Sequence, residues 1–491
     1  MQNLIVVNNP EEWDLDVEGV QVVPAREYLT DPTYSKLRGV RVFNIARSYR
    51  YQRTGYYVSL LAAARGHRPL PDIETIQDLK SRSVVRLASD DVDELAQRCL
   101  APLQSREFVL SVYFGHNMAQ RHDRLAAALF QQFPAPFLRA QFERDEGDGR
   151  WELRNIDSIG VGDIPEAHRP YVRQVAHDYF AARSRRHVRR ASSGYDLAIL
   201  VNPEEAEPPS NERAIKRFVK AGEQVGLGVD VIGPDDLGRI AEYDALFLRE
   251  TTAVNHRTFR AARRAEGLGL VVMDDPASIL RCTNKVFLAE VMERNGVPAP
   301  RTLIVHKYNV DSIRSTIGLP AVLKQPDSSY SRGVVKVETP EELEEEVARL
   351  LGGSDLVVAQ EYLPTEFDWR IGVLDGHPFY ASRYFMAKDH WQIVKRDEKG
   401  EGEDWGVPET LPVEMAPTPI VKAAVKAAAL IGDGLYGVDV KESGGKPFVI
   451  EVNDNPTIDA GFEDAVLKDE LYLRIMRVFL ERIRRRKEGS R

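Results

Sequence analysis

The chain has 491 residues, of which 43% are hydrophobic and 29% charged, and its formal net charge is −9 at pH 7. This composition is typical of a globular protein of about three domains, and the negative charge argues against a general nucleic-acid binder. The sequence contains no run of about 18 apolar residues, so no membrane span is predicted. The two cysteines, Cys99 and Cys282, are too few for a disulfide framework or a zinc site, so we expect a cytoplasmic protein.

Residues 1–182 predict a mixed α/β domain. Apolar runs at 4–7 and 108–114 predict strands, and residues 56–65 predict a helix. The segment 47–57 is rich in arginine and tyrosine, a combination that can bind a carboxylate or the surface of a partner. A plainer interpretation is a loop whose tyrosines pack and whose arginines face water.

A basic segment at 183–195 follows, which we interpret as a linker. Residues 196–275 alternate apolar runs with helical patterns, and this alternation predicts a second α/β domain with a parallel sheet. The expected strands are 197–201, 229–232, 245–248 and 270–273, and the expected helices are 212–225 and 257–265.

Residues 276–485 are predicted to carry the chemistry, with a lid lobe at about 305–363. Lys324 ends an apolar strand, where its charge needs an anionic partner. The loop after it is rich in small and hydroxyl-bearing residues, whose backbone N–H groups can bind phosphate. Lys285 opens a helix that Asn284 can cap. Each lysine alone would be an ordinary surface residue, but their order in the chain favours phosphate binding.

The segment 432–437 matches G-x-G-x-x-G, yet it follows a helix and precedes a strand. A dinucleotide-binding loop has the reverse order, so we interpret this match as a turn. Residues 360–363 end another predicted strand, where main-chain amides and a carboxyl group can bind an adenine edge. Arg370 and Arg383 on the following strands could stabilise developing charge, although either alone would be an ordinary salt bridge.

The most informative pattern is a hairpin of two buried strands at 436–440 and 448–453, joined by a glycine-rich turn. Asp439 lies in the first strand. Glu451 and Asn453 are two residues apart in the second, so their side chains share a face. Two carboxylates and an amide oxygen on one face suit a hard cation such as Mg²⁺. The alternative is a structural salt bridge or an exposed edge hairpin.

In order and spacing, these parts resemble the ATP-grasp superfamily, and within it the RimK-type carboxylate–amine ligases, over residues 196–485. Residues 1–182 are similar to the extra domain that precedes some RimK-like proteins. The resemblance implies α/β and α+β architecture: an N-terminal α/β domain at 1–182, a parallel-sheet pre-ATP-grasp domain at 196–275 and a two-lobed ATP-grasp domain at 276–485.

The resemblance also assigns roles to residues of this chain. Arg370 and Arg383 would stabilise the acyl phosphate and the tetrahedral species. Two Mg²⁺ ions, or Mn²⁺, would be bound by Asp439, Glu451 and Asn453. The ribose would bind to Glu361 or Asp368. The ATP contacts implied by the resemblance are Lys285, Lys324, Ser329, Ser331, Gly333, Gln360, Glu361, Tyr362, Leu363 and Asp368.

The implied reaction is ATP-dependent formation of an amide or peptide bond through an acyl phosphate. The substrates would be a carboxylate, on an amino acid, short peptide or protein tail, and an amine donor, and a homo-oligomer is expected. The alternatives are an ATP-grasp kinase and a non-catalytic ATP-binding regulator whose N-terminal domain binds a partner. Residues 327–333 lack the usual glycines, and 387–392 do not match the basic stretch of glutamate-adding enzymes, so the substrate is expected to differ.

Overall fold

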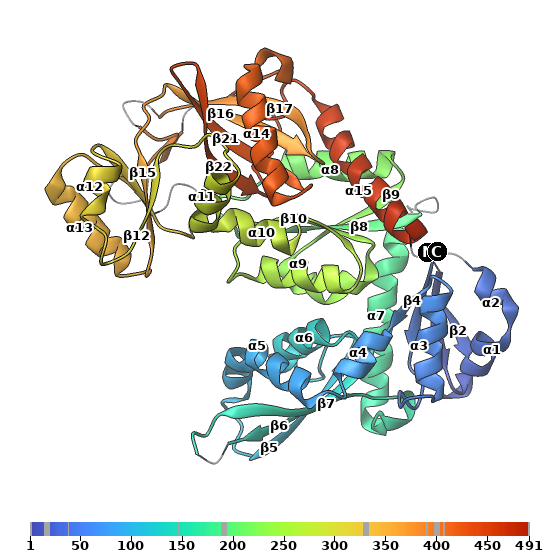
Figure 1. Ribbon diagram of the computed structural model, residues 1–491. Helices are drawn as coiled ribbons and strands as arrows, with labels where there is room; N and C mark the ends of the chain where they lie inside the picture. Colours follow the sequence, from blue (N-terminus) through green and yellow to red (C-terminus); the bar gives the residue numbers. More distant parts are fainter. Residues whose placement is uncertain are drawn as a thin grey trace. The chain divides into compact units, whose positions relative to one another are not determined.

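The computed structural model describes residues 2–13, 20–37, 39–145, 147–187, 194–327, 333–387, 391–396, 403–405 and 408–489. The chain forms two compact units. The N-terminal unit consists of Met1–Asp196 with Asp235–Tyr243, and the C-terminal unit of Leu197–Pro234 with Asp244–Arg491. Figure 1 colours the first mainly blue to teal and the second green to red. Among the described residues, no helix combines the length and the apolar character that crossing a membrane requires.

The N-terminal unit begins with a parallel sheet in the order β2-β1-β3-β4. Its elements are β1 (Gln2–Val7), β2 (Val20–Pro24), α1 (Ala25–Thr30), α2 (Pro32–Lys36), β3 (Val40–Asn44), α3 (Thr54–Ala64), β4 (Arg68–Leu70) and α4 (Ile73–Asp78). Leu4 and Val58 pack in the core on one face of this sheet, whereas Ile5 and Val7 pack in the core on the other. A strand buried on both faces is a continuous apolar run, which is why the first strand could be predicted.

The same unit continues with an antiparallel sheet in the order β5-β6-β7. Its elements are α5 (Arg82–Leu100), β5 (Glu107–Tyr113), α6 (Asp123–Gln132), β6 (Phe137–Arg144), β7 (Trp151–Ser158) and α7 (Arg169–His187). The ring of Phe43, on β3, lies 4.8 Å from that of Phe180 in an edge-on contact, so both sheets share one core. Helix α7 reaches His187, so the expected linker begins inside a helix, and residues 188–193 lie outside the described residues.

The C-terminal unit begins with a sheet in the order β11-β10-β8-β9. Its elements are β8 (Tyr195–Val201), α8 (Glu212–Gln224), β9 (Leu227–Ile232), β10 (Ala245–Arg249), α9 (Arg257–Gly267), β11 (Val271–Met273), α10 (Pro276–Thr283) and α11 (Lys285–Arg294). Strand β10 pairs in parallel with β8 and with β11, which confirms the predicted parallel α/β arrangement. The carboxyl ends of such strands form one edge, where ligands of α/β proteins usually bind.

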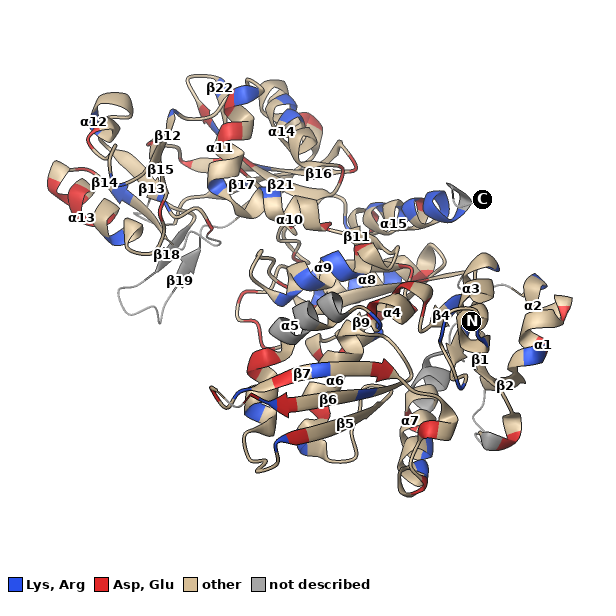
Figure 2. Ribbon diagram, turned by 60° about the horizontal axis from the view of Figure 1, so that its bottom comes forward, with Lys and Arg blue, Asp and Glu red and all other residues tan. Residues whose placement is uncertain are grey.

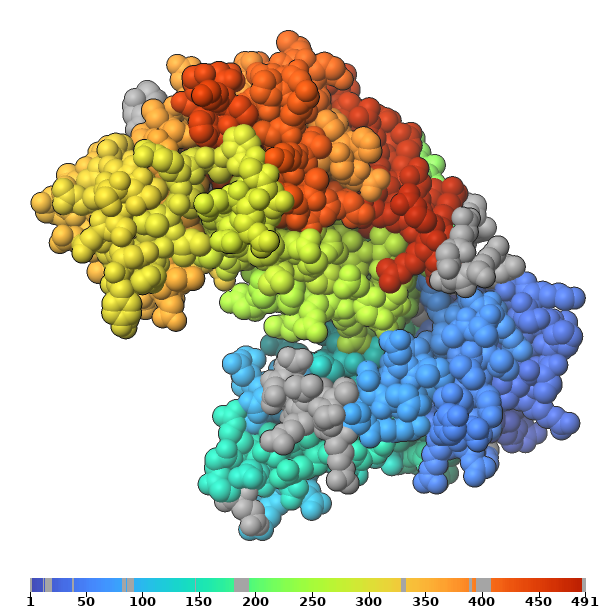
Figure 3. Space-filling view, in the orientation of Figure 1, coloured from blue at the N-terminus to red at the C-terminus, as the bar shows by residue number. Residues whose placement is uncertain are grey.

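A small lobe follows, which we call the lid lobe. Its elements are β12 (Thr302–Val305), α12 (Ser312–Thr316), β13 (Ala321–Lys324), β14 (Val334–Val337), α13 (Pro340–Leu351) and β15 (Val357–Glu361), with the sheet order β12-β15-β13-β14. Leu323 and Val347 lie in its core. Acidic side chains gather on α13, as Figure 2 shows. In Figure 3 the lid lobe is the yellow and light-orange part of the C-terminal unit.

The last part is an antiparallel sheet in the order β20-β17-β16-β21-β22. Its elements are β16 (Phe367–Leu374), β17 (His377–Phe385), β20 (Pro408–Leu411), α14 (Thr418–Ile431), β21 (Leu435–Ser443), β22 (Lys446–Asp454) and α15 (Asp469–Gly489), beside a short ribbon of β18 (Val394–Arg396) and β19 (Glu403–Trp405). The alanine-rich α14 packs on one face, where Ala424 and Ala427 lie in one core with Trp369 and Val438. The opposite face is left for polar side chains.

Candidate functional site

The predicted hairpin is formed by β21 and β22, and it brings the proposed metal ligands together. Asp439 lies directly opposite Glu451 in the antiparallel register, and Gly437 lies opposite Asn453. Gly444 and Gly445 form the turn at φ values of +58° and +71°, in the region that glycine adopts without strain. Because opposed residues of an antiparallel pair share a face, all three polar side chains project from one side of the sheet.

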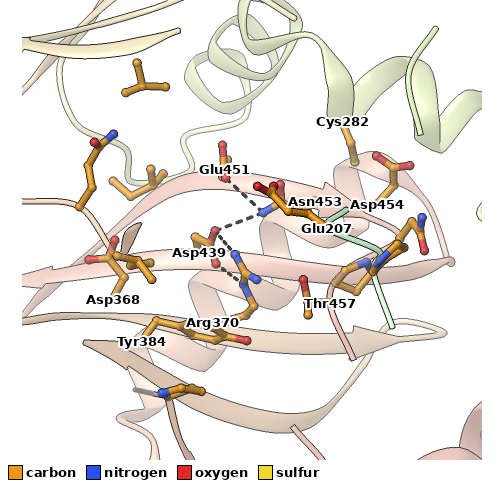
Figure 4. Close-up of a pocket in the computed structure, with 18 of the residues that line it drawn as sticks. Glu207, Cys282, Asp368, Arg370, Tyr384, Asp439, Glu451, Asn453, Asp454 and Thr457 are labelled. Carbon is orange, nitrogen blue, oxygen red and sulfur yellow. Dashed lines mark hydrogen bonds and ion pairs between the residues drawn. The ribbon is translucent and has the colours of Figure 1, made fainter. Parts of the chain in front are cut away.

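Asn453 links the two carboxylates. Its Nδ2 donates to Asp439 Oδ2 at 3.2 Å and to Glu451 Oε1 at 3.3 Å. Figure 4 shows the three side chains converging on one another. The sequence therefore predicted a real cluster of oxygen-bearing side chains.

Arg370 holds the first carboxylate from the neighbouring strand. Its Nε and Nη2 donate to the two oxygens of Asp439 at 2.7 and 2.8 Å, a bidentate pair that forms because the residues lie opposite each other on β16 and β21. Burial raises the pKa of Asp439 to about 6, although the Arg370 charge opposes the shift. The guanidinium group also lies 4.7 Å from the ring centre of Tyr384.

The pKa of Glu451 shifts in the opposite direction from that of Asp439. Burial favours its neutral form, but Lys285, Lys324 and Arg370 together outweigh burial and lower the pKa of its carboxyl group. It is therefore ionised at neutral pH, directly beside Asp439.

The chemistry of these side chains fits magnesium. In the described part of the chain no three His, Cys, Asp or Glu residues cluster in a way that would hold a metal. The set here is instead two carboxylates and one amide, all hard oxygen donors that suit Mg²⁺. A carboxylate offers about four lone-pair positions, so the pairing of Asp439 with Arg370 leaves acceptor capacity for a cation.

Lys324 lies at the end of β13 and is almost completely buried. Its Nζ donates to Gln360 Oε1 at 2.8 Å. Burial, together with the charges of Lys285 and Lys441, lowers the pKa of Lys324 to about 8. A lysine held in this way gains stability when an anion approaches it.

Lys285 is the first residue of α11. The Asn284 side chain caps this helix by accepting from the backbone N–H groups of Val286 and Phe287. The same side chain donates to Asp327 Oδ1 at 2.8 Å, so the start of the predicted phosphate loop is attached to α11. Gly333 ends that loop at φ +67°, where a Cβ would lie 2.6 Å from the Gln325 side chain. Ser329 and Ser331 lie outside the described residues.

Two further predicted residues carry carboxylates with cationic partners. Glu361 accepts from Arg301 Nε at 3.0 Å, and this hydrogen bond lowers the pKa of Glu361. Asp368 accepts from Lys441 Nζ at 2.6 Å and from Thr365 Oγ1 at 3.0 Å. Lys441 was not predicted, although its position two residues after Asp439 on the same strand was a usable signal.

A cavity of about 650 Å³ joins these groups between the lid lobe and the five-stranded sheet. Apolar side chains of the lid lobe and of β22 contribute to its wall, namely Val322, Val334 and Ile450. Many polar and charged side chains line it beside these apolar ones, and a cavity in which such groups converge has the character of a ligand site. The predicted residues that line it are Lys285, Lys324, Gln360, Glu361, Tyr362, Leu363, Asp368, Arg370, Asp439, Glu451 and Asn453.

Arg383 does not line this cavity. It lies opposite Trp369, and its guanidinium group lies 5.0 Å from the ring centre of Phe367 and 4.9 Å from that of Trp369. Its Nη1 lies 3.5 Å from Glu409 Oε2. The next residue, Tyr384, lies on the cavity side instead.

The sequence offers His390 and Trp391 as substrate contacts, with a packed tryptophan on a loop as the favoured interpretation. Trp391 lines the cavity and its ring meets that of Tyr362 edge-on at 6.0 Å, whereas His390 lies outside the described residues. Further cavity residues were not predicted. The pre-ATP-grasp part contributes Thr252, and the irregular segment after β22 contributes Asp454, Asp459, Phe462 and Glu463. No regular spacing marks that segment, so a sequence pattern could not have found it.

Comparison with known proteins supports the resemblance seen in the sequence. Residues 25–175 match the family model of the RimK-like ATPgrasp N-terminal domain. The chain is also 27% identical over 273 residues to a probable alpha-L-glutamate ligase of Marinomonas sp. strain MWYL1, a match that covers 52% of this chain and 87% of that protein. The chain is therefore similar to RimK-like ATP-grasp proteins.

A second relative of this chain is a probable alpha-L-glutamate ligase of Vibrio vulnificus strain YJ016. It is 28% identical over 274 residues, and the match covers 52% of this chain and 87% of that protein. A RimK domain ATP-grasp protein from Sphaerobacter thermophilus is similar in structure, with 16% identity, a TM-score of 0.44 and coverage of 57% and 98%. The predicted resemblance to RimK-like ATP-grasp proteins and the predicted α/β and α+β fold class are confirmed.

Proposed function

We propose that this protein is an ATP-dependent carboxylate–amine ligase that forms an amide or peptide bond through an acyl phosphate. The observation that carries the proposal is the convergence, in one cavity, of two lysines, an arginine and an oxygen-rich cluster that suits Mg²⁺. The ligase class predicted from the sequence agrees with the names of the relatives, which are probable alpha-L-glutamate ligases.

ATP would bind with its base against the end of β15. The main-chain groups of residues 360–363 lie at the cavity wall beside apolar side chains, which suits a flat, weakly polar base. Glu361 or Asp368 would bind the ribose, and Lys285 and Lys324 would bind the phosphates. We expect the loop at 327–333, to which Ser329 and Ser331 belong, to cover them.

Asp439, Glu451 and Asn453 would hold Mg²⁺, as two ions. Mg²⁺ bound there would neutralise the negative charge of the phosphates. The chain's own residues do the rest of the positioning. Arg370 would orient Asp439 through its bidentate contact, and Lys324 would contact the phosphates.

The reaction then has two balanced steps. An oxygen of the substrate carboxylate attacks the γ-phosphorus, the bond to the leaving oxygen breaks, and ADP departs. The amine attacks the acyl carbon, the C–N bond forms, the C–O bond to phosphate breaks, and the amine loses a proton. Arg370, the arginine that lines the cavity, would stabilise the negative charge that develops in the second step. Arg383 would support the sheet instead.

The experiment that tests this proposal is ADP release with Mg-ATP across a panel of amino acids and short peptides, with products identified by mass spectrometry. A Glu451→Ala variant is the control. We expect a product heavier by one amide-linked unit that is absent with the variant. A phosphorylated alcohol would instead support the kinase, and tight ATP binding without turnover on any compound would support the regulator.

The domain boundaries at 182, 195 and 275, a cytoplasmic location and a homo-oligomeric state stay predictions. Size-exclusion chromatography with light scattering tests the last of these directly. Cys99 and Cys282 are both free thiols, in keeping with a reducing compartment.

A further inference from the structure

The charged residues of the cavity are not evenly mixed. The cationic side chains that line it lie on α11, the lid lobe, β16 and β21: Lys285, Lys324, Arg370 and Lys441. Beyond Asn453 the lining carries carboxylates instead, from Asp454, Asp459 and Glu463, and Glu207 adds another. In Figure 4 Asp368 and Asp454 lie on opposite sides of the Arg370–Asp439 pair. We call the part lined by Asp454, Asp459 and Glu463 the acidic end.

The carboxylates of the acidic end are held by neutral donors. Tyr384 donates its hydroxyl to Glu463 Oε1, and the Asp459 backbone N–H donates to Glu463 Oε2 at 2.7 Å. Thr252 donates to Asp454 Oδ2 at 2.6 Å, and the Asn211 backbone N–H to Asp459 Oδ1 at 2.5 Å. These bonds fix the orientation of the carboxylates without neutralising their charge.

Burial gives these carboxylates a reason to attract a cation. It raises the pKa values of Asp459 and Glu463. The charges of Arg249 and Arg213 oppose this shift at Asp459, and Arg249 is itself hydrogen-bonded to Ser210 and Asn455. Within the described residues, no lysine or arginine forms an ion pair with Asp454 or Glu463. A desolvated negative charge is stabilised when an ammonium or guanidinium group binds beside it.

An aromatic ring marks the same end independently of the charges. Phe462, which lies between Asp459 and Glu463 in the sequence, lines the cavity and is 43% exposed, an unusual degree of exposure for a large apolar side chain. Tyr384 also lines the cavity, but its ring already lies 4.7 Å from the guanidinium group of Arg370 and its hydroxyl donates to Glu463. Aromatic faces attract cations, and carboxylates combined with rings are a common way of binding ammonium groups.

We propose that the acidic end binds the positively charged group of a basic amino acid, or of a short peptide that carries one. This inference rests on the proposed function, since it concerns the substrate of the same cavity. The substrate's carboxylate or amine would react near Arg370 and Asp439, while its ammonium or guanidinium group lies against Glu463, Asp459 and Asp454. The same end would repel an acidic side chain, so glutamate is excluded as the preferred substrate.

The test measures binding and not only turnover. L-lysine and L-arginine are titrated calorimetrically into the full-length protein saturated with Mg²⁺ and a non-hydrolysable ATP analogue, beside L-norleucine and L-glutamate. Norleucine has the shape of lysine without its terminal charge. We expect lysine or arginine to bind at least about tenfold more tightly than either comparison compound, as is typical for a charge-assisted contact.

Two charge-removing variants test whether the acidic end contacts the basic group of the amino acid. Glu463→Gln and Asp454→Asn keep the size of the side chains and remove their charges. We expect each to weaken binding of the basic amino acid about tenfold and to leave affinity for the ATP analogue within about twofold. Glu414→Gln is the matched control, because Glu414 is exposed and does not line the cavity.

The outcomes separate this inference from the proposed function. Tighter binding of glutamate or norleucine than of lysine and arginine would overturn the inference while leaving a ligase in place. The inference would also be overturned if both Glu463→Gln and Asp454→Asn kept the preference for lysine and arginine over norleucine and glutamate. If the ATP analogue does not bind at all, the proposed function fails. If basic amino acids still bind in that case, and bind more weakly to Glu463→Gln and Asp454→Asn, the acidic end binds basic groups independently of the proposed function.

Discussion

The two faces of the five-stranded sheet use arginine in opposite ways. On the cavity face, Arg370 forms a bidentate pair with Asp439 and leaves its charge next to the predicted metal cluster. On the other face, Arg383 lies over the rings of Phe367 and Trp369 and reaches Glu409 at 3.5 Å. The two residues are neighbours on paired strands, yet strand alternation separates their surroundings completely.

This comparison teaches that the site is defined by the face of the sheet and not by residue type. A charge on the cavity face is placed where charge develops during the proposed reaction. A charge on the opposite face contributes only packing and a weak ion pair. Substitutions on the two faces should therefore affect different measurements.

The largest effect is expected for Asp439→Asn, which keeps the shape of the side chain on the cavity face. It removes a metal-binding charge and the partner of the buried Arg370 at once. We expect ADP release to fall by at least about 1,000-fold. The measurement is initial rate at saturating Mg-ATP, and a loss of less than tenfold would show that the hairpin is not the metal-binding element.

The next prediction tests the comparison directly with the pair Arg370→Lys and Arg383→Lys. Lysine keeps the charge but cannot form the bidentate contact. We expect turnover to fall about 100-fold or more for the first and to stay within about threefold for the second. Equal losses in kcat would mean that both faces take part in the reaction, and the distinction drawn between them would be wrong.

A pH dependence should arise from Lys324. Because its pKa is lowered to about 8, the free protein loses this ammonium charge as pH rises through that value. Binding of a non-hydrolysable ATP analogue should therefore be strongest below about pH 7 and weaken by up to about tenfold by pH 9. Lys324→Met should bind more weakly at pH 7 and show a flat profile. A wild-type profile that rises with pH would contradict the assignment.

The smallest effect is expected for Glu361→Gln, at the rim of the cavity. Its carboxylate pairs with the exposed Arg301, so removal of the charge should shift the melting temperature by less than about 2 °C. If Glu361 binds the ribose, the KM for ATP should rise a few-fold while that for 3′-deoxy-ATP stays constant. If the KM for ATP rises only in the Asp368→Asn variant, the ribose is bound by Asp368 instead.

The sequence predicted the hairpin because both strands are rich in apolar and β-branched residues and the turn between them is marked by glycines. It could not decide whether residue 383 or 384 faces the cavity. That choice depends on the register of β16 and β17, which shifts at a bulge between Gly372 and Val373. The acidic end depends on long-range contacts such as Thr252 to Asp454, which no local pattern encodes.

The central claim is that this cavity activates a carboxylate as an acyl phosphate. The most direct measurement uses the carboxylate substrate that supports ADP release, labelled with oxygen-18 in its carboxyl group. We expect one labelled oxygen in the inorganic phosphate for each amide formed, and none with Glu451→Ala. Phosphate free of label, released together with the amide, would contradict the acyl phosphate and with it the proposed function.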